Sequence, residues 1–381
     1  MRHNQSERRG NDMTLVSTSV VDAVNTLTTR WCAVAGEDDF AVSGAGVWPL
    51  LALLTSAADE FAQRDLVAAL GIPACDAQRA ALDLIELLDS AQSTSAALGL
   101  WVRKNLPLQQ EWTSALPDGV VAELTDQATL DHWAADRTGG LISEFPLTIT
   151  TQMVLVLASA LLARTEWVDP FSEHDGQLSR TTRGTGGVAI LERDITRVIV
   201  TGHGDLDVHL VIGDGTAAHV LAVGIGELTG RATVDSLDTF SAATRSPGLT
   251  VKYINSPHPS DVVSLSLPAF DIRCSHDLLD QIELFGLRGI AEPDRGHLPG
   301  LSVVPLYVSD GAQEIVATFS ATGFEAAAVS AFGLRMGSAL PRDSHLVKLV
   351  QVDVDRPFGF IAVHRPHRLA IAAGWVRTPF R

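Results

Sequence analysis

Histidine and aspartate residues gather in one short stretch of the sequence, and both types can bind a metal ion or exchange protons. The stretch contains His203, Asp205, Asp207, His209, Asp214 and His219. These residues are irregularly spaced and include no His-x₃-His pair of the kind found in zinc sites. We therefore expect strand side chains that point to solvent, with a metal site as the less favoured alternative. His364, His367 and Arg368 are expected at a surface turn.

Catalysis through a nucleophile requires an exposed serine or cysteine with a base nearby, and the sequence has no motif of this kind. A Gly-x-Ser-x-Gly element is absent. Residues 224–230 are glycine-rich, but the glycines are spaced one residue too far apart for a dinucleotide-binding fingerprint. We predict no catalytic residue, no cofactor, no metal and no enzymatic activity.

The composition is that of a globular protein with a large core, since 46% of the 381 residues are hydrophobic. The net charge is −17 and no long basic run occurs, which argues against nucleic-acid binding. No apolar run is long enough for a membrane helix. Cys32, Cys75 and Cys274 are too few and too scattered for a disulfide framework. The polar N-terminus lacks a secretory signal, so we expect the protein in the cytoplasm.

The stretch from Gly323 to Arg342 is unusually rich in small residues. Every second residue is apolar or small, in the order Phe324, Ala326, Ala328, Ser330, Phe332 and Leu334. This weak alternation would suit a strand with one buried face, although alanine and glycine are poor strand formers. Taken alone, the stretch is interpreted as a surface loop that is able to enter a sheet.

The remaining pattern predicts an α+β protein, with helices in the first third and strands after it. Apolar residues at helical spacing predict helices at 14–34, 47–58, 61–70, 77–88, 106–115, 126–142 and 276–285. Apolar runs predict strands or connectors at 40–42, 95–102, 120–124, 152–157, 196–200, 208–212, 218–223, 262–267, 301–308, 312–319, 346–354, 358–363 and 369–376. Residues 172–190 are expected to form a loop and a short strand. We predict a disordered tail at 1–13 and one domain at 14–381.

Six short motifs in a fixed order resemble the serpin family over about residues 14–381, in the manner of a bacterial-type member. They lie at 133–142, 154–171, 265–270, 297–302, 306–328 and 352–361. The last departs from the family at Gly359, where a large apolar residue is usual. The resemblance implies helices packed on a large central mixed β-sheet, additional sheets, and an exposed reactive-centre loop at about 321–345.

The resemblance also implies a function. Such a protein is a suicide substrate of a serine or cysteine protease, which cuts the exposed loop. The cut loop then inserts into the central sheet and traps the protease, so the native fold is a kinetically trapped state. We expect a monomer with a protease as its partner. Much of the family is secreted, which leaves an extracellular location as the alternative.

The family's hinge maps onto the small-residue stretch. Its residues here are Gly323, Phe324, Glu325, Ala326, Ala327, Ala328 and Ser330. Phe324 departs from the family, which usually has a small residue there, and a large ring must open the sheet before it becomes buried. Ala321 stands where glutamate is usual. These departures motivate the alternative of a non-inhibitory binding or carrier protein.

A second set of residues matches the region that governs opening of the family's sheet, namely Ser43, Ser159, Trp167 and Gln313. Gly46, Ser159 and Gln313 stand where serine, asparagine and histidine are frequent. We expect that Ser159 and Gln313 can share a hydrogen bond. The alternative is that these are ordinary residues at the edge of the core.

The position of the cut bond is left open by two ways of counting. Counting from the hinge places the bond at Gly337–Ser338, whereas counting back from Pro357 places it near Leu346. An arginine would suit a trypsin-like protease and a methionine a chymotrypsin-like protease, although the arginines are equally well explained as solvated charges. The candidates are Arg335, Met336, Gly337, Ser338 and Arg342.

Overall fold

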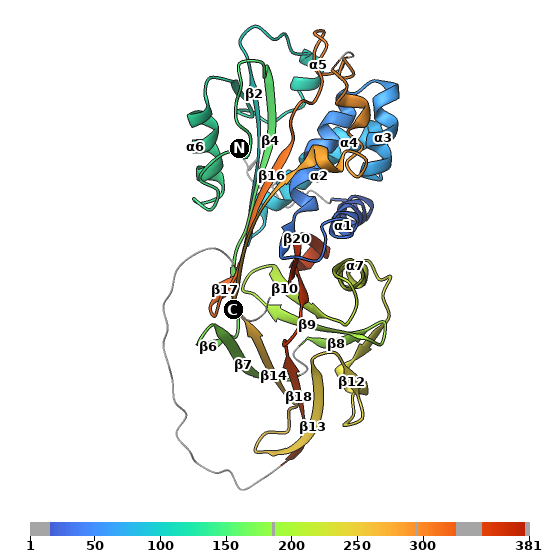
Figure 1. The fold of residues 1–381 in the computed structure, drawn as a ribbon, viewed down its shortest axis with the longest axis vertical. Coiled ribbons are helices and arrows are strands. Elements are labelled where there is room, and N and C mark those ends of the chain that lie inside the picture. Colours follow the sequence, from blue (N-terminus) through green and yellow to red (C-terminus); the bar gives the residue numbers. More distant parts are fainter. Residues whose placement is uncertain (1–15, 185–186, 294–295, 325–344, 378–381) are drawn as a thin grey trace, which may run out of the picture.

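The computed structural model describes residues 16–184, 187–293, 296–324 and 345–377 (Figure 1). Its helices are α1 (Thr18–Cys32), α2 (Gly44–Ala57), α3 (Glu60–Leu70), α4 (Ala74–Ser90), α5 (Gln110–Thr113), α6 (Gln127–Arg137) and α7 (Ala217–Leu228). The expected tail at 1–13 lies outside the described residues. No helix in the described part of the chain is long and apolar enough to cross a membrane.

Local sequence explains where these helices begin and end. The Ser17 hydroxyl accepts a hydrogen bond from the backbone N–H of Val20, and the Asp59 carboxylate accepts one from Ala62, so each caps a helix start. Gly71 ends α3 with a φ of 75°, a left-handed conformation that glycine adopts without strain. Helix α2 is apolar nearly all round and is buried in the core.

Two sheets form the lower part of the molecule in Figure 1. One has the order β1 (Phe40–Val42), β20 (Leu369–Val376), β19 (Phe358–His364), β10 (Leu206–Ile212), β9 (Ile195–Thr201), β8 (Val188–Leu191), β11 (Val234–Ser236). The other has the order β12 (Arg245–Ser246), β13 (Leu249–Ser256), β18 (His345–Asp353), β14 (Val262–Pro268), β7 (Gln177–Arg183), β6 (Ser172–His174).

The expected central mixed sheet is present in two parts. The first part has the order β3 (Val121–Glu123), β2 (Thr94–Val102), β4 (Leu155–Ala163), with β3 parallel and β4 antiparallel to β2. The second has the order β15 (Phe270–Asp277), β16 (Ala312–Phe319), β17 (Gly323–Phe324), β5 (Thr165–Glu166). In Figure 1, β2, β4 and β16 run along the long axis of the molecule, with α6 on one side and α2 on the other.

Several expected elements differ from those observed. Residues 218–223 were expected as a strand but lie in α7, because their apolar residues belong to a longer helical pattern that includes Ala217, Leu221 and Ile225. The prediction of a helix at 276–285 is wrong, because β15 continues to Asp277 and a short 3-10 turn follows at Leu278–Gln281. Residues 301–308, expected as a strand or a connector, form a connector with one isolated bridge at Ser302.

Strand lengths also differ from expectation. The strand expected at 152–157 begins at Leu155 and continues to Ala163, and alternate residues are only half-buried, so it is not buried on both faces. Residues 172–183 form the β6–β7 hairpin rather than a loop, with positive φ at Asp175 and Gly176 in its turn. The helix expected at 106–115 is reduced to Gln110–Thr113.

Candidate functional site

The two parts of the central sheet face each other across unpaired edges. Strand β4 pairs with β2 along its whole length, and β16 pairs with β15 from Ala312 to Phe319. On its other edge β16 pairs only at Phe319, and no ladder joins it to β4 among the described residues. We call the space between the facing edges of β4 and β16 the slot. Its rims carry backbone N–H and C=O groups that lack a strand partner, which is the arrangement that accepts another strand.

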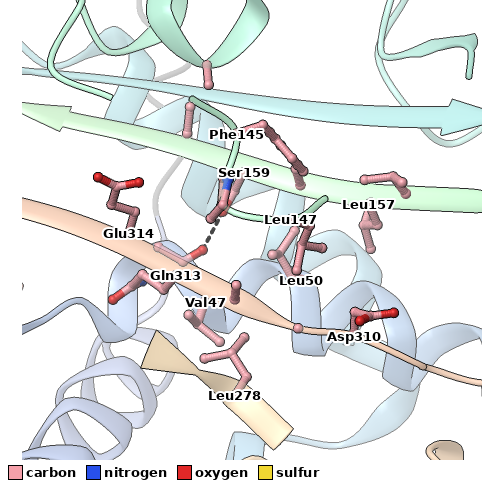
Figure 2. Close-up of a pocket in the computed structure, with 18 of the residues that line it drawn as sticks. Val47, Leu50, Phe145, Leu147, Leu157, Ser159, Leu278, Asp310, Gln313 and Glu314 are labelled. Carbon is pink, nitrogen blue, oxygen red and sulfur yellow. Dashed lines mark hydrogen bonds between the residues drawn. The ribbon is translucent and has the colours of Figure 1, made fainter. Parts of the chain in front are cut away.

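The slot opens into a cavity of about 710 Å³. Val47, Leu50 and Leu54 of α2 line one side. Residues 141–154, which connect α6 to β4 and which we call the roof, line another side through Phe145 and Leu147. Figure 2 shows Leu50 of α2 and Leu147 of the roof between the two strands. The cavity is therefore an apolar space beneath an opening that has the length of a strand.

The hinge residues Gly323 and Phe324 already occupy one end of the slot as β17. Gly323 pairs with Glu166 of β5, and Phe324 pairs with Thr165 on one side and with Phe319 on the other. A Cβ atom on Gly323 would stand 2.4 Å from the carbonyl oxygen of Thr165, so the close approach of the two strands requires glycine. This pairing starts a new strand between β16 and β5.

The Phe324 ring is buried, with 4% of its surface exposed. It lies 6.3 Å from the Phe360 ring, measured between centroids, and Phe360 in turn packs on Phe270 at 4.9 Å. The sequence led us to expect a ring that still had to open the sheet. The structure differs, because Phe324 is seated in the sheet on an aromatic cluster while the rest of the slot is unpaired.

Trp167 holds the turn between β16 and β17. Its indole Nε1–H donates to the carbonyl of Ser320 at 2.9 Å, and its backbone N–H donates to the carbonyl of Thr322 at 2.9 Å. The ring packs on Phe319 at 4.6 Å and is almost fully buried. The residue expected in the sheet-opening region therefore fixes the point at which the chain turns into the slot.

Ser43, Ser159 and Gln313 meet at the N-terminus of α2. The Gln313 side chain accepts from the Ser43 N–H at 2.9 Å and donates to the Ser43 carbonyl at 3.0 Å. The Ser159 hydroxyl donates to the Gly46 carbonyl. The expected hydrogen bond between Ser159 and Gln313 is not formed, because each side chain bonds to α2 instead. The two rims, on which both residues are seen in Figure 2, are thus tied separately to one helix.

A match to a sequence family identifies this arrangement. The sequence model of the serpin family, described as serine protease inhibitors, matches residues 24–181 and 235–379. The chain belongs to the serpin family. No curated protein sequence matches it significantly.

Solved serpin structures share the fold of this serpin at low sequence identity. Human thyroxine-binding globulin complexed with thyroxine is 16% identical, with a TM-score of 0.70 over 97% of this chain and 100% of that chain. The native state of the thermophilic serpin tengpin is 15% identical, with a TM-score of 0.70 over 99% and 97%. A serpin described as highly specific, from the insect Tenebrio molitor, is 17% identical, with a TM-score of 0.66 over 95% and 98%. At these identities the likeness shows the fold.

Other candidate residues of this serpin lie outside the described part of the chain. They are the hinge residues Glu325, Ala326, Ala327, Ala328 and Ser330 and the bond candidates Arg335, Met336, Gly337, Ser338 and Arg342. Their roles stay predictions. Gly323 and Phe324 are the last described residues before this stretch.

One contact across the slot was not anticipated from the sequence. The Arg273 guanidinium on β15 donates to the carbonyl of Leu141 in the roof at 3.3 Å and lies 3.2 Å from a carboxylate oxygen of Glu314 on β16. Within the described residues this is the one hydrogen bond that joins the roof to β15 or β16. A lone arginine on a strand gives no signal of such a role in the sequence.

The expectation that the six histidine and aspartate residues point to solvent is only partly correct, because His203, Asp214 and His219 are exposed but others are not. Asp207 and His209 are buried rather than turned to solvent, and the Asp207 carboxylate accepts two hydrogen bonds from Arg365, each 2.7 Å long. His364 is also buried, not at the surface. Among the described residues no group of three or more ligands is placed to hold a metal ion.

Burial shifts the titration of this cluster. Burial, together with the positive charges of Arg197 and Arg368, lowers the pKa of His209 to about 3. Burial likewise lowers the pKa of His364, although Asp205 at 3.5 Å acts in the opposite direction. These histidines are therefore neutral at pH 7 and serve the packing of the lower sheets.

Proposed function

We propose that this serpin inhibits serine proteases as a suicide substrate, with cleavage after the hinge followed by insertion of the cut strand into the slot. One observation carries the proposal: β17 is seated at the end of a slot whose two rims are otherwise unpaired. A strand that continues from Phe324 toward Ala312 and Leu155 would pair with both rims. The apolar cavity beneath supplies room for its inward side chains.

The free energy for insertion would come from pairing and burial. Each backbone hydrogen bond contributes roughly 1 kcal/mol net, so pairing along both rims would supply on the order of 10 kcal/mol. Small residues at Ala326, Ala328 and Ser330 would enter with little displacement of the cavity lining. The barrier lies in lifting the roof and freeing the rims, which keeps the uncut chain kinetically trapped.

A binding or carrier protein is the alternative. The departures of Ala321 and Phe324 from the residues that are usual in the family's hinge motivate it. Thyroxine-binding globulin, which has the same fold, was solved with thyroxine bound. A carrier would still be cut in its loop by proteases but would not retain them.

Incubation with trypsin-, chymotrypsin-, elastase- and subtilisin-like proteases separates the two functions. An inhibitor gives, with at least one protease, a covalent complex that survives boiling in SDS. Mass spectrometry of the released fragment then locates the cut bond among residues 335–342. A panel that yields only cleaved chain and full residual protease activity would leave the carrier function as the better account.

A further inference from the structure

All of the described charged residues that line the slot cavity are acidic. Its lining includes the carboxylates of Asp310 and Glu314, and among the described lining residues there is no Lys, Arg or His. Figure 2 shows Glu314 toward one end of the drawn part of the cavity and Asp310 toward the other, with Leu50 and Leu147 between them. The space is thus apolar in the middle and acidic at its margins.

The two carboxylates are not equivalent. Glu314 has a cation beside it, because Arg273 lies 3.2 Å from its Oε1 atom. Asp310 accepts a hydrogen bond from the hydroxyl of Ser309 at 2.6 Å and has no ion pair within the described residues. Asp310 is therefore the carboxylate at the cavity that can pair with the cationic group of a ligand.

We propose that the slot cavity binds a lipophilic ammonium ion, with its apolar body between α2 and the roof and its ammonium group beside Asp310. A volume of about 710 Å³ lies within the range of small-molecule sites in proteins. An ammonium group has three N–H donors and no acceptor, so it suits a carboxylate together with the unpaired backbone carbonyls of the rims. An anion of the same shape would meet the Asp310 carboxylate, and the one cation near the cavity, Arg273, already lies beside Glu314.

Such a ligand would also regulate insertion, an effect that rests on the proposed function. The ligand and the cut strand need the same space between β4 and β16, so the ligand must leave before the strand enters. A ligand at ten times its dissociation constant leaves about one molecule in eleven unoccupied, which slows insertion roughly tenfold.

Calorimetric titration with three matched probes tests the binding itself. Decylammonium, decanoate and decanol share one chain and differ in the charge of the head group. We expect decylammonium to bind at one site and at least about fivefold more tightly than decanol, with decanoate weakest. Equal affinities of decylammonium and decanoate would overturn the proposal.

Two variants assign the site. Asp310→Asn, at an exposed residue, should abolish the preference for decylammonium over decanol, whereas Asp235→Asn, which removes an exposed carboxylate on β11, should leave it unchanged. Leu147→Trp, which fills the cavity from the roof, should weaken all three probes, with the ligand-free melting temperature as the folding check. Unchanged selectivity in Asp310→Asn would contradict the assignment.

A final experiment separates this inference from the proposed function. The loop is cut by a protease with and without decylammonium, and the gain in thermal stability is followed in time. If the ligand slows the gain in thermal stability, the result supports both the inhibitory function and the regulation of insertion by the ligand. If a saturating concentration of ligand does not slow the gain, the proposed regulation is wrong. No gain in either sample would contradict the inhibitory function alone, because the titration tests binding independently.

Discussion

Phe324 is held in the sheet by packing on one face and by backbone pairing on both sides. The sequence marked this residue as a departure from the family, but it could not show that the ring already had a site. That site is built by residues far away in the sequence, chiefly Phe360 and Phe270. The large ring thus acts as an anchor of the hinge in the uncut protein.

Phe324→Ala should release the hinge from the sheet. Truncating a buried phenylalanine costs about 3–5 kcal/mol, which is more than the few backbone pairs of β17 supply. Hydrogen exchange at the amides of Phe324 and Thr165 should then accelerate by at least about 100-fold. Phe61→Ala removes a ring that is 53% exposed and is the matched control. Unchanged exchange in Phe324→Ala would show that the ring does not hold the hinge.

His209 should make stability depend on pH. Its pKa is lowered from 6.5 to about 3 in the folded state, so between these values the unfolded chain binds the additional proton. The contribution of the neutral His209 ring to the free energy of unfolding is therefore fully present above about pH 6.5, and it is lost as the pH falls toward 3. The free energy of unfolding should drop by about 1.4 kcal/mol per pH unit between pH 6 and pH 4 from this group. His209→Gln should lose that part of the slope in urea titrations, and an unchanged slope would contradict the assignment.

At the scale of elements, the roof and the rims decide how readily the slot opens. Arg273 spans the slot, because it contacts both Leu141 in the roof and Glu314 on β16. Other hydrogen bonds of the roof are made on the side of α6 and β2, for example with Asp131 and Arg103. Arg273→Gln should therefore speed opening. Partly exposed contacts of this kind are worth about 1 kcal/mol or less, so we expect a two- to fivefold increase.

Hydrogen exchange of the roof amides measures this rate. Glu314→Gln is the matched variant, because it removes the ion pair but leaves the bond from Arg273 to the Leu141 carbonyl. Arg79→Gln, at an exposed pair with Asp83 on α4, controls for the loss of a surface arginine. Equal hydrogen-exchange rates of the roof amides in Arg273→Gln and Arg79→Gln would show that Arg273 does not restrain the roof.

Helices and strands could be predicted from the sequence where a regular spacing of apolar residues continues over many residues. The pattern from Val20 to Trp31 and the paired runs at 358–363 and 369–376 fixed α1, β19 and β20 closely. Short apolar runs were ambiguous: residues 218–223 fit a strand until the helical spacing on both sides is considered. The β6–β7 hairpin was missed because its residues are mostly polar and β6 is exposed at the edge of the sheet.

At the scale of the whole molecule, the order of six motifs was enough to predict the fold. The division of the central sheet was not predictable, because unpaired edges depend on which strands meet in space rather than on any local pattern. The same holds for Ser159 and Gln313, whose types suggested a mutual bond. Their actual partners on α2 follow from the separation of β4 and β16.

The melting temperature of the protein before and after its loop is cut tests the central claim most directly. Insertion into the slot would add on the order of 10 kcal/mol of pairing, which for a chain of this size corresponds to a rise of at least about 10 °C. We expect this rise after cleavage between residues 335 and 342. A cleaved chain that melts at the same temperature as the intact protein would contradict the claim that the slot receives the cut strand.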